Sequence, residues 1–423
     1  MRNAIWLNSA LLVLLCCGAM AQTPQPWTWE KVVQRFEVSN PNLLADKLNI
    51  DESKAQEIAA FLRPNPTFTL SVDGTQIAPD RGIWRPFTGT FESPSISYLH
   101  ERQHKRELRL ESAKKGTLIA ESTHADVERT MLFNLRGAFV SALQAKAVLQ
   151  LAKDNLDYYD RLLQISRDRF QAGDIAQIDL DRLELQRVQY ESDLQAAEEN
   201  LETAKIQLLT LLNDRTPLDQ FDVTGLFDFN DQLMPRDEFR KIALDTRPDL
   251  KAAVEAVDKA QTDYKLAIAN GSTDPIFSAW YIHNSSTNNP FAINTVGVSV
   301  SIPLRIFDRN QGEKLRTQLD ITRTERLREA AEAAVLSDVD SSYATLESNL
   351  TLLRPYKAKY LQQSVRVRDT ISFSYQHGGT SLLDFLNAQA EYRSVQLNYV
   401  NLVGTYLTAA AQLNLAVGRE VIP

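Results

Sequence analysis

Residues 170–180 read FQAGDIAQIDL, and residues 375–385 read YQHGGTSLLDF. The second stretch repeats the first about 205 positions later, with an aromatic residue, a glutamine, a glycine and an aspartate in the same order. The same offset persists through the apolar positions that follow, so chance is a poor explanation. These positions are Leu180, Leu183, Tyr190, Leu194, Ala197, Leu201, Ala204, Leu208 and Leu211, matched by Phe385, Ala388, Val395, Tyr399, Leu402, Tyr406, Ala409, Leu413 and Ala416. The chain therefore contains one structural unit twice.

Long helices are predicted on both sides of each glycine. No proline occurs between Pro94 and Pro217, and residues with high helix propensity dominate this region. A continuous helix from about 102 to 171 would span on the order of 100 Å, at about 1.5 Å per residue. A helix of that length needs partners along it, and the apolar heptad over 180–211 predicts a returning coiled-coil helix.

The second copy repeats this plan, with one irregularity. An outward helix is predicted from about 310 to 377, followed by a turn and a returning helix over 382–417. Pro355 interrupts the outward helix, because proline removes a backbone donor and clashes with the preceding turn, so we expect a kink or a junction there. Asn213 and Gly418 suit the left-handed conformation that follows a helix end.

Two β-hairpins are predicted, one ahead of each helical hairpin, within about 66–100 and 276–304. In both, apolar residues alternate with small polar ones, which is the period of a strand with one apolar face. The apolar members are Phe68, Leu70 and Val72 in the first hairpin and Val296, Val298, Val300 and Ile302 in the second. The returning strand of the first hairpin is expected at 87–99. Four strands are too few to close a barrel, so they form an open sheet or are pooled by several chains.

The N-terminus has the features of a secretory signal peptide over residues 1–21. Arg2 precedes an apolar run over 11–17, and the small residues Ala19 and Ala21 lead to a cleavage site before Gln22. The mature protein is therefore expected to be exported. No later segment approaches the run of roughly 20 apolar residues that a helical membrane span needs.

The only two cysteines, Cys16 and Cys17, lie inside this segment. A chain cleaved after Ala21 would contain no thiol and no disulfide, and packing alone would hold it together. A lipoprotein that begins at Cys16 or Cys17 is the alternative, although the residue before each cysteine is not small. The net charge of -8 argues against nucleic acid as a partner.

One catalytic motif occurs. Residues 100–104, HERQH, fit the pattern H-E-x-x-H, which on a helix places His100 and His104 on one face for zinc, with Glu101 as general base. Taken alone, the motif predicts a zinc metalloprotease, with Glu121 or His124 as the third ligand.

Three observations count against this interpretation. The motif lies where a strand is expected to turn into a helix, no third histidine follows in metzincin spacing, and the matching residues 305–309 of the second copy contain no histidine. The chain also lacks a G-x-S-x-G or phosphate-loop motif. We therefore expect a solvated polar corner, no enzyme activity, and no metal or other cofactor.

The layout resembles that of the TolC-like outer membrane efflux factors of Gram-negative bacteria, over nearly the whole mature chain. The most specific element is a strand-to-helix corner similar to that of the branch serving heavy-metal exporters. It comprises Ile302, Pro303 and Leu304, followed by Phe307, Asp308, Arg309, Asn310, Gln311 and Gly312. The sequence Arg247-Pro248-Asp249-Leu250, which opens a short helix, also fits the family pattern, with Asn40-Pro41 at the corresponding place in the first copy.

The resemblance implies a fold that is mainly α with a small β part. Three chains would pool their strands into one 12-stranded β-barrel through the outer membrane, and the helical hairpins would form a tunnel across the periplasm. Pooling would remove the exposed strand edges and hide backbone groups from lipid. The repeats divide the chain into a signal peptide at 1–21, a first repeat at 22–213, an equatorial connecting region at 214–246 and a second repeat at 247–418.

The resemblance also implies the function, an outer membrane channel of a tripartite efflux pump that passively conducts solutes such as metal cations or drugs. The implied partners are two further copies of the chain, a periplasmic adaptor protein, an inner membrane transporter of the proton-driven type, and outer membrane lipid. In the family, the far turns of the tunnel form a gate and meet the adaptor. By position these turns are Ala172, Gly173 and Asp174 in the first copy and Gly378, Gly379 and Thr380 in the second.

The turns depart from the pattern best known in drug exporters, which has a valine before the glycine and an apolar residue after it. Ala172 and Asp174, or His377 and Gly379, occupy those places here, so the sequence leaves the substrate open. A periplasmic coiled-coil adaptor or structural protein is the alternative function. Such an adaptor has one helical hairpin between strand-rich domains, whereas this chain has two, each preceded by an amphipathic strand pair.

Overall fold

The structure is a computed structural model that describes residues 25–87, 89–284, 291 and 293–422. It contains two packing units. One comprises Ser141–Phe227 with the described residues of Met1–Phe36, and the other comprises Glu37–Val140 with the described residues from Asp228 onward. The expected signal peptide, with Cys16 and Cys17, lies outside the described residues. None of the described helices is both long enough and apolar enough to cross a membrane.

The first unit is built on a helical hairpin. Its outward arm is the second half of α3 (Lys105–Gln171), its returning arm is α4 (Gln177–Leu211), and α1 (Trp29–Ser39) begins in this unit. Tyr159 of α3 is fully buried, its ring stacks on Tyr190 of α4 at 4.4 Å, and its hydroxyl donates to the backbone oxygen of Leu183 at 2.9 Å. Leu180, Leu183, Tyr190, Ala197, Ala204 and Leu208 are buried, which confirms the predicted heptad.

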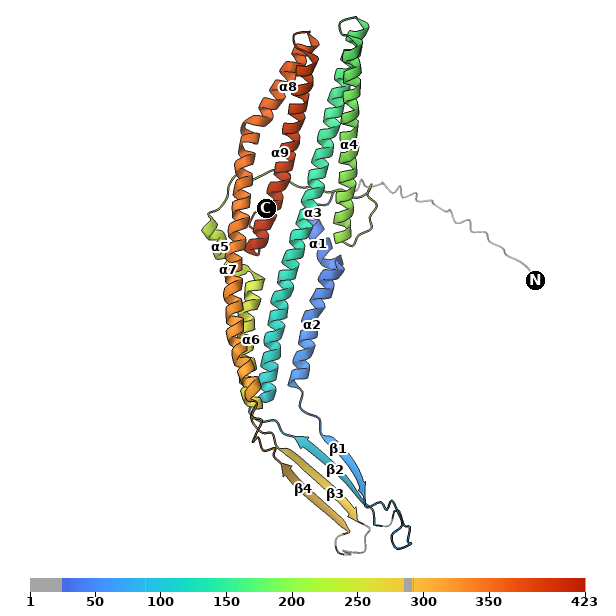
Figure 1. The fold of residues 1–423 in the computed structure, drawn as a ribbon, viewed down its shortest axis with the longest axis vertical. Coiled ribbons are helices and arrows are strands. Elements are labelled where there is room, and N and C mark those ends of the chain that lie inside the picture. The colour runs from blue at the N-terminus through green and yellow to red at the C-terminus, as the bar shows by residue number, and fades with distance from the viewer. Residues whose placement is uncertain (1–24, 88, 285–290, 292, 423) are drawn as a thin grey trace, which may run out of the picture. The chain divides into compact units, whose positions relative to one another are not determined.

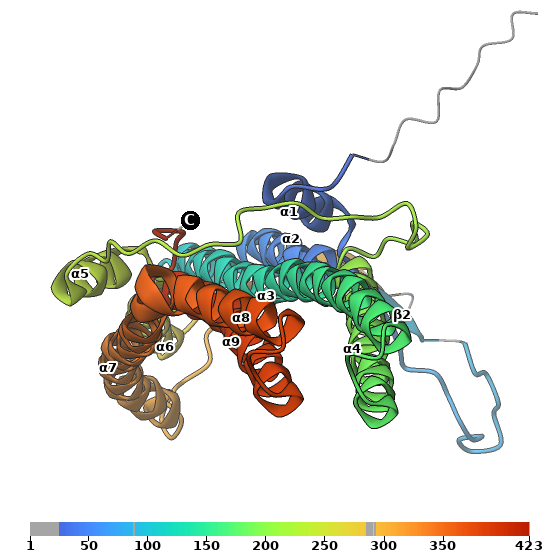
Figure 2. The same cartoon turned by 90° about the horizontal axis from the view of Figure 1, so that it is seen from above.

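The second unit contains the remaining elements (Figure 1). Its helices, besides the first half of α3, are α2 (Pro41–Phe61), α5 (Arg236–Thr246), α6 (Pro248–Asn270), α7 (Gln311–Pro355), the π-helix η1 (Tyr356–Tyr360), α8 (Leu361–Gln376) and α9 (Leu382–Val417). α7 packs against α6 and α9, and α8 packs against α9. Viewed along the helices, α5 lies beside α7 (Figure 2).

Short polar contacts join α3 to α2 on one side and to α6 on the other. Thr117 of α3 donates to Glu57 of α2 at 2.5 Å, and Ser122 of α3 donates to Glu255 of α6 at 2.8 Å. The starts of α2 and α6 follow from sequence, because each has proline at its first position. The side chain of Asn40 also accepts hydrogen bonds from two backbone amides of the first turn of α2.

The four strands form one antiparallel sheet in the order β1 (Thr67–Asp73), β2 (Phe91–Leu99), β3 (Ile276–Asn284) and β4 (Asn294–Ser301). The two predicted hairpins therefore pair with each other through β2 and β3, and β1 and β4 are the two open edges of the sheet. The prediction that the returning strand of the first hairpin starts at Phe87 was wrong. That strand starts at Phe91, because Gly89 adopts a positive φ of 91° that interrupts an extended strand.

The irregularity at Pro355 is confirmed and has a defined form. α7 ends at Pro355, the five-residue π-helix η1 follows, and α8 continues from Leu361. Asn213 and Gly418 have positive φ values of 48° and 92°, as the sequence suggests.

Candidate functional site

The two tips are the turns Ala172–Asp174 and Gly378–Thr380, and they have the same backbone geometry. Gly173 and Gly378 have φ values of 85° and 75°, in the left-handed region that favours glycine. Asp174 N donates to Arg169 O at 2.9 Å, and Gly379 N donates to Ser374 O at 2.8 Å. Such bonds close the last carbonyls of a helix in a Schellman turn. The sequence repeat therefore encodes one local structure twice.

At the second tip, a side-chain cap stabilises the start of the returning helix. Ser381 is the N-cap of α9, where its hydroxyl accepts from Asp384 N at 3.1 Å and donates to the Asp384 carboxylate at 2.7 Å. Thr380 donates to the same carboxylate at 3.3 Å. The corresponding N-cap of α4 is Ala176, which has no side-chain acceptor. Asp179 and Asp384 both lie within the first helical turn, so neither is itself the N-cap.

Apolar contact supports the second tip from below. Phe385 is fully buried, and its ring stacks on that of Tyr375 at 4.8 Å. His377 packs its ring against Phe373 at 4.1 Å, and Phe373 is 64% exposed. The second tip therefore rests on the buried Tyr375–Phe385 pair and exposes the ring of Phe373 to solvent.

The sheet has one apolar and one hydroxyl-rich face, and both are largely exposed. Strand register places Phe68, Ile96, Ala279 and Val298 in one row across all four strands. The adjacent row, on the opposite face, contains Thr67, Ser97, Ser278 and Ser299. Phe68 is 69% exposed and Val298 83% exposed, so nothing within the described chain covers the apolar face.

One aromatic side chain fills a gap on the polar face. Trp280 pairs with Gly297 across β3 and β4, and a Cβ at Gly297 would lie 2.4 Å from the Trp280 ring. The glycine therefore accommodates the indole flat against the strand.

The predicted strand-to-helix corner acts through its polar side chains. Asn310 adopts a φ of 63°, and its amide donates to the backbone oxygen of Ala267 on α6 at 2.8 Å. Asp308 accepts from Asn310 N at 2.8 Å, and Gln311 accepts from Arg309 N at 2.8 Å. These contacts turn the chain from β4 into α7 and attach the turn to α6. The backbone oxygen of Phe307 accepts from the side-chain amide of Gln311 at 3.0 Å, while the Phe307 side chain is 89% exposed.

The H-E-x-x-H residues lie at the equivalent corner of the first copy and are not helical. Gln103 and His104 have φ values of 59° and 54°, and α3 begins only at Lys105. His100 and His104 therefore do not share a helical face. Glu101 instead pairs with Arg109, at 2.9 Å for one of its two contacts. Among the described residues, no group of three metal-binding side chains is gathered.

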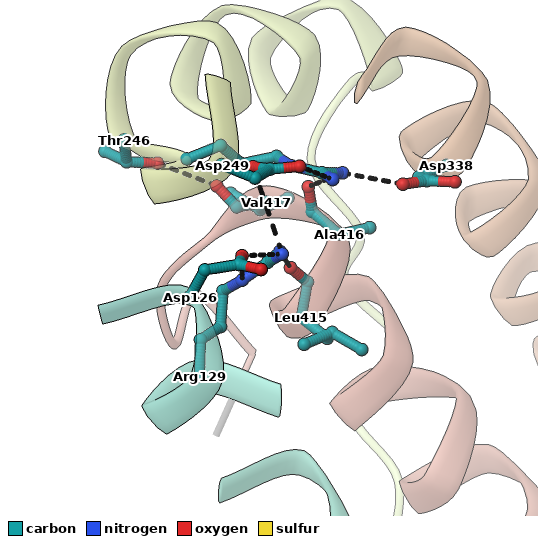
Figure 3. A network of polar contacts seen from close by, with 9 residues as sticks. Asp126, Arg129, Thr246, Asp249, Asp338, Leu415, Ala416 and Val417 are labelled. Carbon is teal, nitrogen blue, oxygen red and sulfur yellow. Dashed lines mark hydrogen bonds and ion pairs between the residues drawn. The ribbon is translucent and has the colours of Figure 1, made fainter. Parts of the chain in front are cut away.

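A buried arginine, Arg247, joins α6, α7 and the end of α9, and we call this group of contacts the clamp (Figure 3). Arg247, 6% exposed, makes a bidentate contact with Asp249 at 2.9 and 2.5 Å and reaches Asp338 of α7 at 2.8 Å. It also donates to Ala416 O at 3.3 Å. Burial disfavours the charged form, but these hydrogen bonds outweigh it and raise the pKa of Arg247.

Two further residues complete the clamp by capping the last carbonyls of α9. Thr246 donates to Val417 O at 2.7 Å, and Arg129 of α3 donates to Leu415 O (Figure 3). Arg129 is oriented by Asp126 at 3.0 Å. The sequence predicts the helix start at Arg247 but not the clamp, because most partners in the clamp are distant in sequence and follow no periodic pattern.

Comparison with known proteins matches this architecture to one family. The chain fits the model of the outer membrane efflux protein family over residues 32–214 and 240–419. It is similar to the cobalt-zinc-cadmium resistance protein CzcC of Cupriavidus metallidurans, at 24% identity over 93% of this chain and 90% of the relative. It is also similar to the outer membrane protein TolC of Escherichia coli, at 21% identity over 96% of this chain and 85% of the relative. Crystal structures of CusC have the same fold, with a TM-score of 0.77 and 17% identity over 92% of both chains.

Proposed function

The chain belongs to the outer membrane efflux protein family, and from this premise we propose that three copies of it close a tunnel with gated periplasmic tips. Members of the family are outer membrane components of tripartite pumps and work as trimers with an adaptor and an inner membrane pump. The released solute would move passively, because the chain itself has no energy-coupling motif, and the transporter would supply the energy.

The observation that carries the proposal is the exposed, two-faced sheet with open edges. An apolar row such as Phe68 to Val298 suits lipid, and a hydroxyl row such as Thr67 to Ser299 suits water. Backbone groups on the edges β1 and β4 cannot remain unpaired in a bilayer. Antiparallel pairing of β4 with β1 of the next copy would satisfy both edges and close a ring.

The helices support the same head-to-tail contact. β1 directly follows α2 in the chain, and β4 directly precedes α7, so each open strand edge continues into one of these helices. Both helices expose apolar side chains that the described chain leaves uncovered. These are Leu44, Leu48 and Ile58 on α2, at 44%, 58% and 69% exposure, and Leu315, Leu319 and Leu327 on α7, at 57%, 62% and 53%. α7 of one copy would therefore pack on α2 of the next.

The tips Ala172–Asp174 and Gly378–Thr380 are proposed as the gate and the adaptor-docking surface. Both are tight turns at the ends of long helices, where small movements of the helices change the opening most. The second tip is the better stabilised, through Ser381 and Asp384.

We propose divalent metal cations as the solute class. The support is the similarity to CzcC, together with the corner Phe307–Gly312 of the metal-exporter type. Cells that lack the chain should become more sensitive to zinc, cobalt or cadmium salts, and expression of the chain should restore resistance. Unchanged metal sensitivity together with increased sensitivity to organic drugs would reject the metal assignment while leaving the channel function in place.

The assembly is tested by the native mass of the purified chain in detergent. A mass of three chains is expected. A monomer that stays monomeric when reconstituted into lipid would contradict the proposal, because its sheet edges would then remain unpaired in the bilayer.

A further inference from the structure

The outward helix of the second hairpin has a built-in joint. Pro355 cannot donate a backbone hydrogen bond, and Leu361 N bonds to Tyr356 O, five residues back, instead of four. A π-turn of this kind interrupts the regular ladder and is a frequent site of helix bending. α7 and α8 are thus separate segments that meet at η1.

A short segment of the connecting region holds this joint from the side. Asp231 accepts from Nε of Arg354, in the last turn of α7, at 2.5 Å. Asp228 accepts from Nζ of Lys357, in η1, at 2.6 Å. The two carboxylates therefore hold the chain one residue before and two residues after Pro355.

The same segment is attached to the returning helix α9. The hydroxyl of Tyr406 accepts from Asn230 N and donates to Asn230 O, both at 3.2 Å. The ring of Phe229 meets the ring of Tyr406 edge-on at 6.0 Å, and Nζ of Lys357 lies 4.9 Å from the Phe229 ring centre. Residues 228–231, which we call the strap, thus join the π-turn to α9.

The strap has different strengths on its two sides. Tyr406 is buried and makes two hydrogen bonds to backbone, whereas Arg354 is 54% and Lys357 50% exposed. Exposed ion pairs weigh little and exchange readily. Movement should therefore break the two ion pairs to α7 and η1 before it separates the strap from α9. The clamp at Arg247 holds the far end of α9 in place.

We propose that the strap is a latch on a hinge at Pro355–Tyr360. With both ion pairs formed, the angle between α7 and α8 at η1 is fixed and the second tip is closed. When they break, α8 tilts at η1 together with the part of α9 that faces it, because the Tyr375–Phe385 stack still joins the two helices, and this movement carries Gly378 and Gly379 with it. This inference rests on the proposed function of the tips as a gate, and it identifies the element that sets the resting state of that gate.

The test compares wild type with the double variant Asp228→Asn and Asp231→Asn, which keeps the side-chain shapes but removes both ion pairs. The matched control is Asp340→Asn, which removes a bidentate ion pair between the same helix α7 and Arg240 of α5, at 2.8 and 2.6 Å, away from the joint. Far-UV circular dichroism and native mass establish that all three proteins are folded and equally assembled.

The first readout is amide hydrogen exchange of the peptide that spans Tyr356–Leu361 in the detergent-solubilised assembly. The double variant should exchange roughly three- to tenfold faster than wild type. This factor corresponds to the small stabilisation against local opening that two exposed ion pairs provide. The Asp340→Asn control should exchange like wild type over this peptide. Equal rates in all three proteins would overturn the latch, and this result does not depend on conduction.

The second readout is single-channel conductance in a planar bilayer, with Ser381→Ala as a variant that loosens the tip directly. The double variant should raise the open fraction, as should Ser381→Ala. If Ser381→Ala opens the channel and the double variant does not, the latch is wrong and the gate remains. If no variant conducts, the proposed function itself fails.

A reversible cross-link gives the opposite perturbation. Asp231→Cys combined with Arg354→Cys, in a chain free of Cys16 and Cys17, should lower the open fraction when oxidised and recover when reduced. An oxidised channel that opens like wild type would also overturn the latch.

Discussion

Nη1 of Arg247, at the start of α6, lies 2.8 Å from Oδ2 of Asp338 on α7. The same guanidinium holds Asp249 and the backbone oxygen of Ala416, so one side chain joins α6, α7 and the end of α9. A buried guanidinium is tolerated only when its N–H donors are hydrogen-bonded. The four hydrogen bonds from Arg247 to Asp249, Asp338 and Ala416 O meet this requirement.

Arg247→Ala should destabilise the second packing unit by about 2–4 kcal/mol, because Asp249, Asp338 and the carbonyl of Ala416 lose the donor that Arg247 provides. Arg247→Lys should recover part of this loss, since it keeps the charge but not the bidentate geometry. Denaturant unfolding measures both. Equal stability of the alanine variant and wild type would show that the clamp does not hold α9.

Gly418→Ala tests the C-terminal end of α9. The glycine has a φ of 92°, and an added Cβ would lie 3.2 Å from Cα of Arg247, so a cost of about 1–3 kcal/mol is expected. Gly312→Ala is the matched control, because nothing lies within 4 Å of its Cβ and it is in the first turn of α7. That substitution should be neutral or stabilise by up to about 1 kcal/mol. Similar thermal shifts in the two variants would contradict this account.

The sequence identified the elements whose signal is periodic or local. The heptad from Leu180, the alternation at Val296 and Val298, and the two tip glycines each depend on neighbours within a few residues, so a pattern reveals them. The clamp and the strap depend on single contacts between segments more than 90 residues apart, such as Arg247 with Asp338 and Lys357 with Asp228. No local pattern marks such pairs, and Pro355 gave only the position of the joint.

The H-E-x-x-H match at residues 100–104 shows that a sequence pattern alone does not establish a zinc site. H-E-x-x-H has chemical meaning only on a helix, and here the left-handed residues Gln103 and His104 delay the helix until Lys105. These two residues determine this outcome, and the motif itself contains no information about backbone conformation.

Replacement of His100 and His104 by alanine should therefore leave export and folding unchanged. Resistance of complemented cells to the exported solute is the measurement. Glu101→Gln is the informative companion, because loss of its contact with Arg109 should lower stability slightly while the histidine variants do not. Loss of export in the variant that lacks both histidines, while the protein still assembles, would contradict this expectation and indicate a metal-dependent role.

Leu319→Asp on α7 should weaken the proposed contact with α2 of the next copy, because it places a charge in an apolar seam. Leu319 is 62% exposed in the single chain, so each chain of the variant should still fold, but the chains should no longer assemble into a trimer. Leu226→Asp, at 83% exposure in the first packing unit and on neither α2 nor α7, is the control that should leave the assembly intact. Native mass distinguishes the two. Full trimer in the Leu319→Asp protein would place the seam elsewhere.

The latch should be insensitive to pH over the physiological range. Burial opposes ionisation of Asp228, but the hydrogen bonds from Lys357 and from Phe229 N outweigh it and lower the pKa of Asp228 below its ordinary 3.8. Its stabilising contribution is therefore present above that value and lost as the pH falls through the lowered pKa. The hydrogen bond to Asp228 raises the pKa of Lys357 above its ordinary 10.5, so the lysine's contribution is present below that value and lost only as the pH rises through the raised pKa.

Between these limits neither Asp228 nor Lys357 titrates. Hydrogen exchange at η1, corrected for the intrinsic pH dependence of exchange, should stay constant from about pH 5 to about pH 8. A change in the corrected exchange rate centred at about pH 6.5 would instead indicate control by a histidine.

The central claim is that three copies of this chain form a gated conduit, and single-channel recording in a planar bilayer tests it most directly when the native mass is determined in the same detergent. A trimer should insert and show small or flickering conductance, and loosening of the second tip by Ser381→Ala should raise that conductance. A protein that stays monomeric and never inserts would contradict the account and favour a periplasmic coiled-coil protein instead.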